Sequence, residues 1–191
     1  MTLSLPIDPA ANDLLNRDPL ALLLGLVLDQ QIPLEKAFTS PYVLAQRLGH
    51  EPTAVELADH DADALVTVFA TPPALHRFPK AMAGRVQAVC RMVADRYAGD
   101  TARIWTEAPD GKALLNRIAE LPGFGRQKAQ IAVALLGKRC DVRPTGWREA
   151  AGAYGAEGSY LSVADITDRD SLLLVREATQ RAKAAAKAAN G

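Results

Sequence analysis

The sequence is poor in several kinds of residue, and each shortage excludes a class of protein. It has only two cysteines, Cys90 and Cys140. Two thiols cannot supply the four ligands of an iron–sulfur cluster, so we expect no such cluster. Because the chain also shows no charged and then apolar leader at its start, we expect a cytoplasmic protein with reduced thiols. The three histidines share no ligand spacing with the cysteines, and we predict no zinc site.

The chain has no excess of charge and no long apolar run. Its 22 basic and 22 acidic residues give a net charge of zero, so any nucleic-acid site must be a local basic patch. The longest apolar run, residues 20–28, is about half as long as a bilayer span, which predicts a buried helix and no membrane partner. With 49% hydrophobic and 23% charged residues, the composition indicates one globular unit over residues 1–191.

Helical periodicity runs through nearly the whole sequence. No period-two run and no Asn-Gly hairpin separate the apolar segments, so the sequence predicts an all-α fold. An aspartate cap and a proline open a helix expected from Pro19 to about Gln31. Further on, residues 111–120 form a helix into a turn, and residues 126–136 form the helix out of it.

Two features near the C-terminus also carry expectations. Ser162 and Asp165 have the spacing of a capping box at the start of a short helical turn. The basic tail at about 182–191 is rich in alanine and lysine and has no apolar face. We therefore expect this tail to be a solvated or frayed end.

The stretch LPGFGRQKAQ, residues 121–130, places a glycine-rich turn before a polar helix start. Its two glycines allow a positive φ or a close approach of the backbone to another group. The helix that follows presents free N–H groups from about Gly123 to Gln127, with Arg126 and Lys128 beside them. Amide donors, a helix dipole and two cations suit a phosphate group. A simple corner between two helices is the alternative interpretation of this turn.

The longer stretch IAELPGFGRQKAQIAVALLGKR resembles the helix–hairpin–helix of the DNA glycosylase superfamily, which includes endonuclease III and the adenine-mismatch and alkyladenine glycosylases. The hairpin of that family usually reads L-P-G-[VI]-G, and the corresponding residues here are Leu121, Pro122, Gly123, Phe124 and Gly125. A second match lies about 90 residues upstream, where ALLLGLVLDQQI, residues 21–32, resembles the helix and turn that insert a side chain into the duplex. The resemblance covers roughly residues 15–155. It implies a two-lobed helical glycosylase fold that binds duplex DNA, with its hairpin motif at 111–137 and without the iron–sulfur cluster.

The resemblance also implies where the chemistry of such an enzyme would lie. In the family, an aspartate after the hairpin helix helps the base to leave the sugar. That position falls here at Pro144 or Thr145, and neither side chain can do acid–base chemistry. We take Asp141 as the candidate catalytic residue, with Glu149 and Asp29 as rivals. An exposed loop position beside two arginines is the alternative for Asp141.

Several other residues take roles from the two matches. The lysine that gives some family members a β-lyase activity falls at Gln127, and Lys128 is rotated from it by about 100°, so we expect no β-lyase activity and a Lys128 that points to phosphate or solvent. Gln31 falls at the position of the side chain that fills the gap left by an extruded base. Gln30 could hydrogen-bond across the corner of the helix, although a polar helix end is the alternative for both glutamines. Asp29 would cap the next helix or act as a substitute carboxylate that faces the cleft.

Two further sites follow from the resemblance. Trp147 stands in the loop that would form a wall of the base pocket, where an aromatic ring could stack on an extruded base, and packing in the core is its alternative role. The backbone carbonyls of Ala119, Leu121 and Phe124 could hold a monovalent cation, potassium or sodium, that bridges to a phosphate. We expect no other cofactor.

Three hypotheses for function remain at this point. The first is a monofunctional base-excision-repair DNA glycosylase, associated with the nucleoid, that hydrolyses the N-glycosidic bond of a damaged or mispaired base. The second is a non-catalytic DNA-binding relative that recognises distorted duplex, because the aspartate of the family is missing. The third is an all-α interaction module whose hairpin is only a corner. Salt-dependent affinity for duplex DNA separates the third from the others, and turnover separates the first from the second.

Overall fold

The computed structural model describes residues 3–189, and within them every regular element is a helix. The all-α prediction is therefore confirmed for this part of the chain. The α-helices are α1 (Pro9–Arg17), α2 (Pro19–Leu28), α3 (Leu34–Leu48), α4 (Ala54–Asp59), α5 (Ala62–Ala70), α6 (Pro79–Tyr97), α7 (Arg103–Thr106), α8 (Gly111–Ala119), α9 (Arg126–Arg139), α10 (Trp147–Ala151) and α11 (Arg169–Ala189). Two short 3-10 helices, η1 (Gly152–Gly155) and η2 (Val163–Asp165), lie between α10 and α11.

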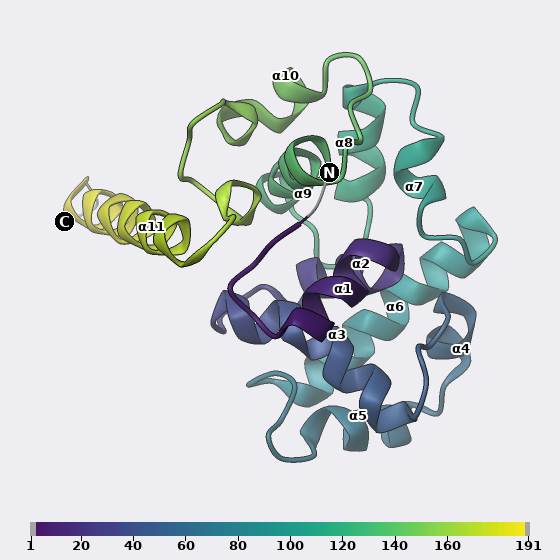
Figure 1. The fold of residues 1–191 in the computed structure, drawn as a ribbon. Coiled ribbons are helices and arrows are strands. Elements are labelled where there is room, and N and C mark those ends of the chain that lie inside the picture. The colour runs from purple at the N-terminus through teal and green to yellow at the C-terminus, as the bar shows by residue number, and fades with distance from the viewer. Residues whose placement is uncertain (1–2, 190–191) are drawn as a thin grey trace.

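The helices pack in two groups, which Figure 1 shows one above the other. In the first group, α2 packs against α1, α3 and α6, while α4 and α5 cover α6. In the second group, α8 and α9 form a hairpin against which α10 packs, and α9 also contacts η1 and η2. The end of α2 lies where the two groups meet (Figure 1).

Helix α2 forms the centre of the first group. Asp18 caps it by accepting a hydrogen bond from the Leu20 backbone N–H at 2.8 Å, and Pro19 is its first residue, as predicted. Every residue from Leu20 to Leu28 is buried. The helix ends at Leu28, three residues before the expected end, because the backbone of Asp29 leaves the helical conformation with ψ of 73°, and Gln31 follows with a left-handed φ of 56°. No helix in residues 3–189 has the length and apolar character to span a bilayer.

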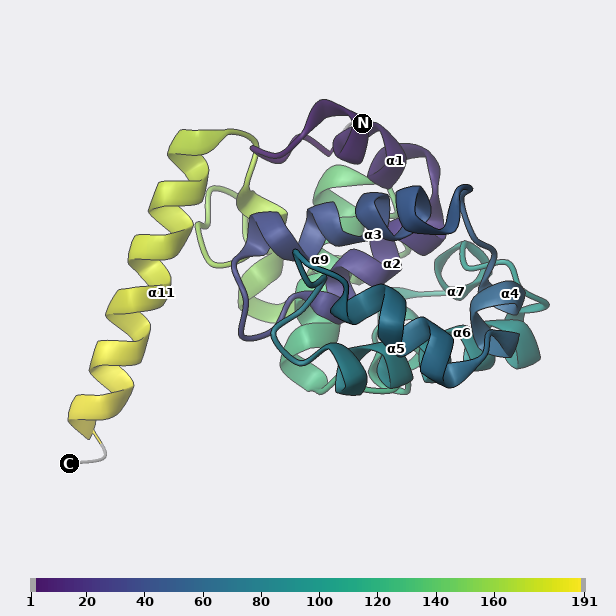
Figure 2. The same cartoon turned by 90° about the horizontal axis from the view of Figure 1, so that it is seen from below.

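The described part of the tail is solvated and not frayed, since its side chains at 181–185, 187 and 188 are exposed and α11 continues to Ala189; residues 190 and 191 lie outside the described residues. Alanine has the highest helix propensity, so this segment is helical without an apolar face. Only the first half of α11 is anchored. Leu172 and Val175 are buried, and Arg176 forms an ion pair with Glu35 of α3 at 2.8 Å. The second half projects from the body, as Figures 1 and 2 show.

Candidate nucleic-acid interface

The turn between α8 and α9 is a tight β-turn. The Phe124 backbone N–H donates to the Leu121 carbonyl at 3.0 Å, and Pro122 and Gly123 are the two central residues. Gly123 has φ of 84°, which is the glycine position of a type II turn. A Cβ atom at Gly123 would also lie 2.5 Å from Cδ of Arg85 on α6. The backbone angle therefore requires glycine here, and a larger residue would also displace the side chain of Arg85.

The start of α9 is an uncapped helix N-terminus. Gly125 is the capping residue, it has no side chain to offer, and no side chain caps the helix. The first backbone bond of the helix runs from the Ala129 N–H to the Gly125 carbonyl at 3.0 Å. The N–H groups of Arg126, Gln127 and Lys128 precede that bond and have no partner within the helix. A Cβ atom at Gly125 would meet nothing within 4 Å, so open space lies beside these donors. This is the arrangement that binds anions at helix N-termini.

The turn after α2 holds its two glutamines in different ways. Gln30 points inward, where its Oε1 accepts from Arg85 at 3.0 Å and its Nε2 donates to the Val27 carbonyl at 2.8 Å. The prediction that Gln30 hydrogen-bonds across the helix corner is confirmed. The Nε2 of buried His76 also donates to the Gln30 carbonyl at 2.9 Å, which fixes the backbone of the turn. Gln31 is exposed on its left-handed backbone, and its role as a wedge stays a prediction.

Lys128 and Asp29 lie near each other between the hairpin and the end of α2, close enough for each to affect the pKa of the other. The Lys128 Nζ donates to the Val27 carbonyl at 2.9 Å and lies 5.1 Å from the centre of the Phe124 ring. The expectation that Lys128 points to phosphate or solvent is therefore wrong. The third residue of α9 faces α2, whose last turn has free carbonyl groups that attract a cation.

Burial changes the pKa of both side chains of this pair. It raises the pKa of Asp29 to about 6, although the nearby Lys128 opposes the rise. Burial also lowers the pKa of Lys128 to about 8, a shift that Asp29 opposes and Arg85 supports. Asp29 does not cap the next helix, because Pro33 is the capping residue of α3 and no side chain bonds there. The first interpretation of Asp29 was therefore wrong, and the carboxylate lies beside the hairpin lysine.

We predict that Asp29→Asn stabilises the protein at neutral pH. The pKa of Asp29 is about 6 in the folded state and ordinarily 3.8, so the folded protein holds this proton more tightly than the unfolded chain. The stability from Asp29 is fully present below the lower value and is lost as the pH rises through the higher one. An amide carries no such cost, and we expect a gain of about 1–2 kcal/mol at pH ~7.5 that disappears near pH ~4. Urea unfolding at the two pH values measures this difference, and a gain that is the same at both would contradict it.

One lysine and one arginine connect the two segments that resemble the glycosylases. Lys128 ties the hairpin helix to the end of α2 through Val27, and Arg85 lies against Gly123 of the hairpin while it donates to Gln30. Exposed Gln31 directly follows Gln30, so the turn that carries it lies next to the start of α9. The uncapped helix start and the exposed glutamine therefore belong to one surface.

The other predicted site residues lie at the opposite end of α9. Trp147 is 8% exposed, and a Cβ atom at Gly137 would lie 2.3 Å from its ring. Gly137 is ten residues after Gln127, which is about 15 Å along a helix. The structure therefore favours core packing for Trp147 over a place in a base pocket at the hairpin. The loop with Pro144 and Thr145 leads directly into Trp147 and lies at the same distant end.

The other two candidate carboxylates are also distant from the hairpin. Asp141 follows the end of α9, its side chain is 67% exposed, and its carboxylate is 3.3 Å from a nitrogen of Arg143. Asp141 thus occupies the exposed loop position that was its alternative role. Glu149 is exposed near the start of α10, beside Gly146. Of the three carboxylates considered, only Asp29 lies at the hairpin.

The proposed cation site involves backbone atoms. The Leu121 carbonyl already accepts the hydrogen bond that closes the turn, and a carbonyl oxygen has a second lone pair to offer. Within residues 3–189, no group of three or more His, Cys, Asp or Glu side chains is arranged to hold a metal ion. The carbonyl site formed with Ala119 and Phe124 stays a prediction.

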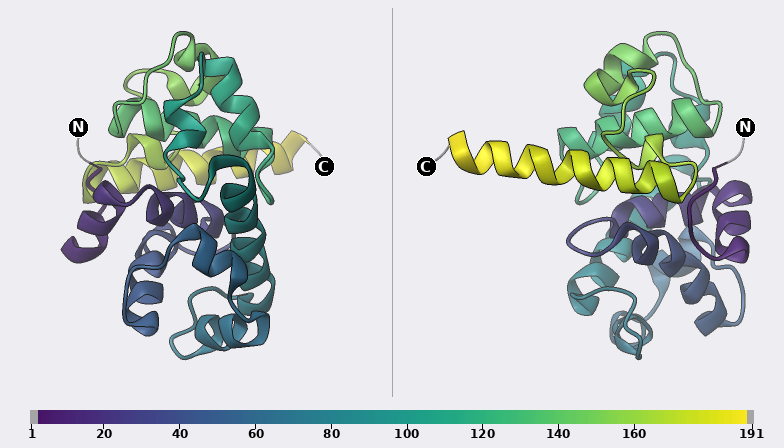
Figure 3. Two further views of the ribbon diagram at one scale, coloured as in Figure 1. Left: turned by 90° about the vertical axis from the view of Figure 1, so that its right-hand side faces the viewer. Right: turned by 60° about the vertical axis from the view of Figure 1, so that its left-hand side comes forward.

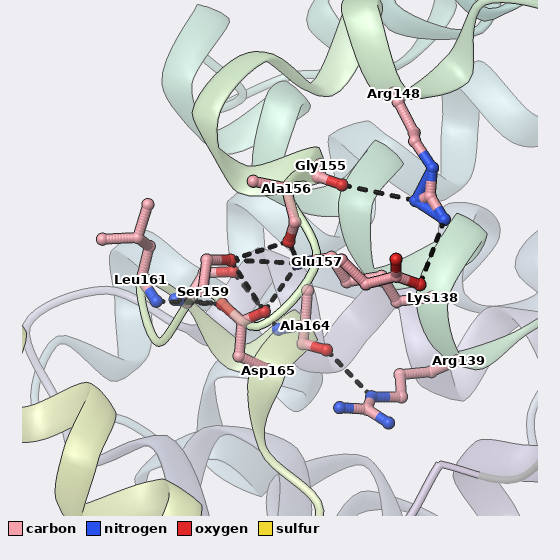
Figure 4. A network of polar contacts seen from close by, with 11 residues as sticks. Lys138, Arg139, Arg148, Gly155, Ala156, Glu157, Ser159, Leu161, Ala164 and Asp165 are labelled. Carbon is pink, nitrogen blue, oxygen red and sulfur yellow. Dashed lines mark hydrogen bonds and ion pairs between the residues drawn. The ribbon is translucent and has the colours of Figure 1, made fainter.

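A buried polar network stabilises the far end of α9, as Figure 4 shows. Lys138 and Asp165 form an ion pair at 2.6 Å, with side chains 12% and 4% exposed. Asp165 also accepts from the Leu161 backbone N–H at 2.9 Å, and Lys138 donates to the Ala156 carbonyl at 2.7 Å. The capping box of Ser162 and Asp165 is confirmed. The ion pair itself has no sequence signal, because its members are 27 residues apart.

Comparison of the chain with protein-family models, with curated proteins and with solved structures gave no match. The argument for function therefore starts from the surface formed by the start of α9 and the turn after α2. That surface offers unpaired amide donors, an exposed amide side chain and a carboxylate next to a lysine.

Proposed function

We propose that the protein binds duplex DNA through the α8–α9 hairpin and the Gln31 turn, and that it is a monofunctional DNA glycosylase of the helix–hairpin–helix type that it resembles. The observation that carries the proposal is the hydrogen bond from Lys128 to the Val27 carbonyl. This bond joins two segments that lie far apart in the sequence and that each resemble the superfamily separately. Such a fold would place the damaged base between the two groups of helices.

The hairpin is the proposed phosphate anchor. Three backbone N–H groups at the start of α9 have no helical partner, and the exposed side chain of Arg126 adds a positive charge. A helix N-terminus of this kind favours a phosphate oxygen through both its donors and its dipole. Contacts of this type position a protein on DNA without reading its sequence.

Gln31 is the proposed wedge, and its replacement has a specific expected result. A side chain inserted into the base stack replaces stacking that an extruded base has lost, so it matters most for duplexes that are already distorted. We predict that Gln31→Ala binds intact duplex as the parent protein does but loses much of the preference for an abasic duplex. Competition binding with the two duplexes measures that preference. If the variant prefers the abasic duplex over the intact duplex as strongly as the parent does, Gln31 is not the wedge.

Asp29 is the proposed catalytic carboxylate. In hydrolysis, the bond between C1′ and the base nitrogen breaks, and its electron pair leaves with the base. Water then forms the new bond to C1′ and keeps one proton as the hydroxyl group of the sugar, while its other proton neutralises the departing base, directly or through solvent. Positive charge develops on the sugar before water attacks, and an ionised carboxylate stabilises that charge. Since the pKa of Asp29 is about 6, base release should rise as the pH increases through this value.

A DNA-binding protein without turnover is the second candidate function. It is favoured by the burial of Asp29, which leaves its carboxylate little open to a substrate. Under this alternative the hairpin and Gln31 would act as proposed, and the protein would recognise distorted duplex without cleaving it.

Base release from a panel of duplexes with damaged or mispaired bases, with and without alkali, decides between the two. For the enzyme we expect strand breaks only after alkali, and we expect Asp29→Asn to abolish them. Asp141→Asn is the matched control, because Asp141 is an exposed aspartate at the other end of α9. Release that persists in Asp29→Asn would remove Asp29 from the mechanism. Salt-dependent binding without release from any duplex would favour the second function.

A further inference from the structure

Helix α11 runs antiparallel to α9 and passes its N-terminus. Near its start, Ser171 and Leu174 line a cavity of about 430 Å³ together with the last residues of α9. Further along, Ala182 and Lys183 line a cavity of about 410 Å³ that also includes Gln127, the second residue of α9. In the right-hand view of Figure 3, α11 lies along the same general direction as α9 and extends past its end, while Figure 2 shows the two helices apart from each other.

The distal end of α11 therefore projects beyond the start of α9. Ala182 is level with Gln127, and seven further residues lead to Ala189. At 1.5 Å per residue, these seven residues extend about 10 Å past that level. The proposed phosphate anchor faces the same side, because the free N–H groups at the start of α9 point away from the body of that helix. DNA bound at the hairpin would lie next to this part of α11.

The charge of the projecting segment suits a polyanion. Residues 178–189 contain three cations, Arg181, Lys183 and Lys187, and no acidic residue. Arg181 is paired with Glu177. Lys183 and Lys187 are four residues apart and share one side of the helix, and in residues 3–189 neither has an ion-pair partner. The uncharged residues here are alanines with one threonine and one glutamine, which offer no large apolar face to a protein partner.

We propose that residues 178–189 of α11 form an arm that binds the DNA phosphate backbone next to the segment held by the hairpin. Lys183 and Lys187 are the residues that make these contacts. The inference rests on the proposed DNA-binding function and extends its surface to an element outside the region that resembles the glycosylases. The arm adds affinity for any duplex and does not choose the base.

The test compares two pairs of charge removals in the full-length protein. Lys183→Gln with Lys187→Gln neutralises the arm, and glutamine keeps the helix propensity of lysine. Lys112→Gln with Arg169→Gln is the matched control, since both residues are exposed and begin α8 and α11, away from the hairpin. The dissociation constant for an undamaged duplex is measured at several salt concentrations, and circular dichroism checks the helix content.

For the arm variant, we expect the slope of log affinity against log salt to fall by about 1.8, or about 0.9 for each lost phosphate contact. Its affinity near 0.1 M salt should fall by roughly 60-fold, and the control pair should keep the slope of the parent. The proposal of a DNA-binding arm is wrong if the slope of the arm variant is unchanged, or if the slope falls equally in the arm variant and the control variant.

The failure of the arm can be told apart from the failure of the proposed function. If the parent protein has no salt-dependent affinity for duplex DNA, both are wrong. If a hairpin variant loses binding while the arm variant binds as the parent does, only the arm is wrong.

Discussion

Gly125→Leu is expected to abolish duplex binding while the protein stays folded. The new side chain would occupy the open space beside the free N–H groups at the start of α9, where the phosphate is proposed to bind. Hydrogen bonds to a charged group contribute about 1.5–3 kcal/mol each, so the loss of two of them lowers affinity at least about 100-fold. Fluorescence anisotropy with a labelled duplex measures the loss.

The backbone at Gly125 explains why the fold should survive this change. Its φ of −85° and ψ of 172° suit any residue, and a Cβ atom there has no neighbour within 4 Å. Gly123 provides the contrast, because its φ is 84° and a Cβ atom would collide with Arg85. Gly123→Leu should therefore destabilise the protein itself, and Gly125→Ala should weaken binding less than leucine does. Binding by folded Gly125→Leu at the parent's affinity would show that the hairpin does not hold phosphate.

Breaking the ion pair between Lys138 and Asp165 is expected to produce the largest loss of stability. Removal of one partner leaves a buried charge without its counter-ion, and such changes typically cost 3–5 kcal/mol, here about 3 kcal/mol because each partner keeps other hydrogen bonds. For Lys138→Met or Asp165→Ala, we expect the Tm to fall by about 6–12 °C. Thermal unfolding followed by circular dichroism measures the fall.

A double variant and an exposed pair control this prediction. Because the two residues interact directly, the combined variant should lose less stability than the sum of the single changes. The ion pair of Arg96 and Glu120 is more than half exposed on both sides, so Arg96→Gln should change stability by no more than about 1 kcal/mol. Additive losses at Lys138 and Asp165 would show that the pair is not coupled.

The sequence predicted those elements that depend on neighbouring residues. The start of α2 at Asp18 and Pro19 and the capping box of Ser162 and Asp165 agree with the structure, because caps and turns are formed by residues within one or two helical turns. The hairpin glycines were identified for the same reason. The end of α2 was misplaced by three residues, since the chain leaves the helix at Asp29 and enters a turn that is held at Gln30 by α6 and His76.

The sequence could not predict contacts between distant elements. Lys128 bonds to a carbonyl 101 residues away, and its direction depends on how the hairpin packs on α2. The same packing places Asp29, not Asp141, at the hairpin. The path of α11 along α9 also depends on tertiary anchoring, through Leu172, Val175 and the ion pair of Arg176 with Glu35. A pattern of alanine and lysine contains no information about that path.

The contacts of Lys128 and Arg85 order the proposed DNA interface when the protein folds, before DNA binds. Both side chains link the hairpin to the turn after α2 through hydrogen bonds or close contacts that exist in the free protein. The conformational entropy of aligning the phosphate anchor with Gln31 is therefore lost on folding and not on association. Preorganisation of this kind leaves more of the contact energy for affinity. On binding, it is then mainly the DNA that must change its shape. The association rate should therefore be higher for duplexes that deform more easily.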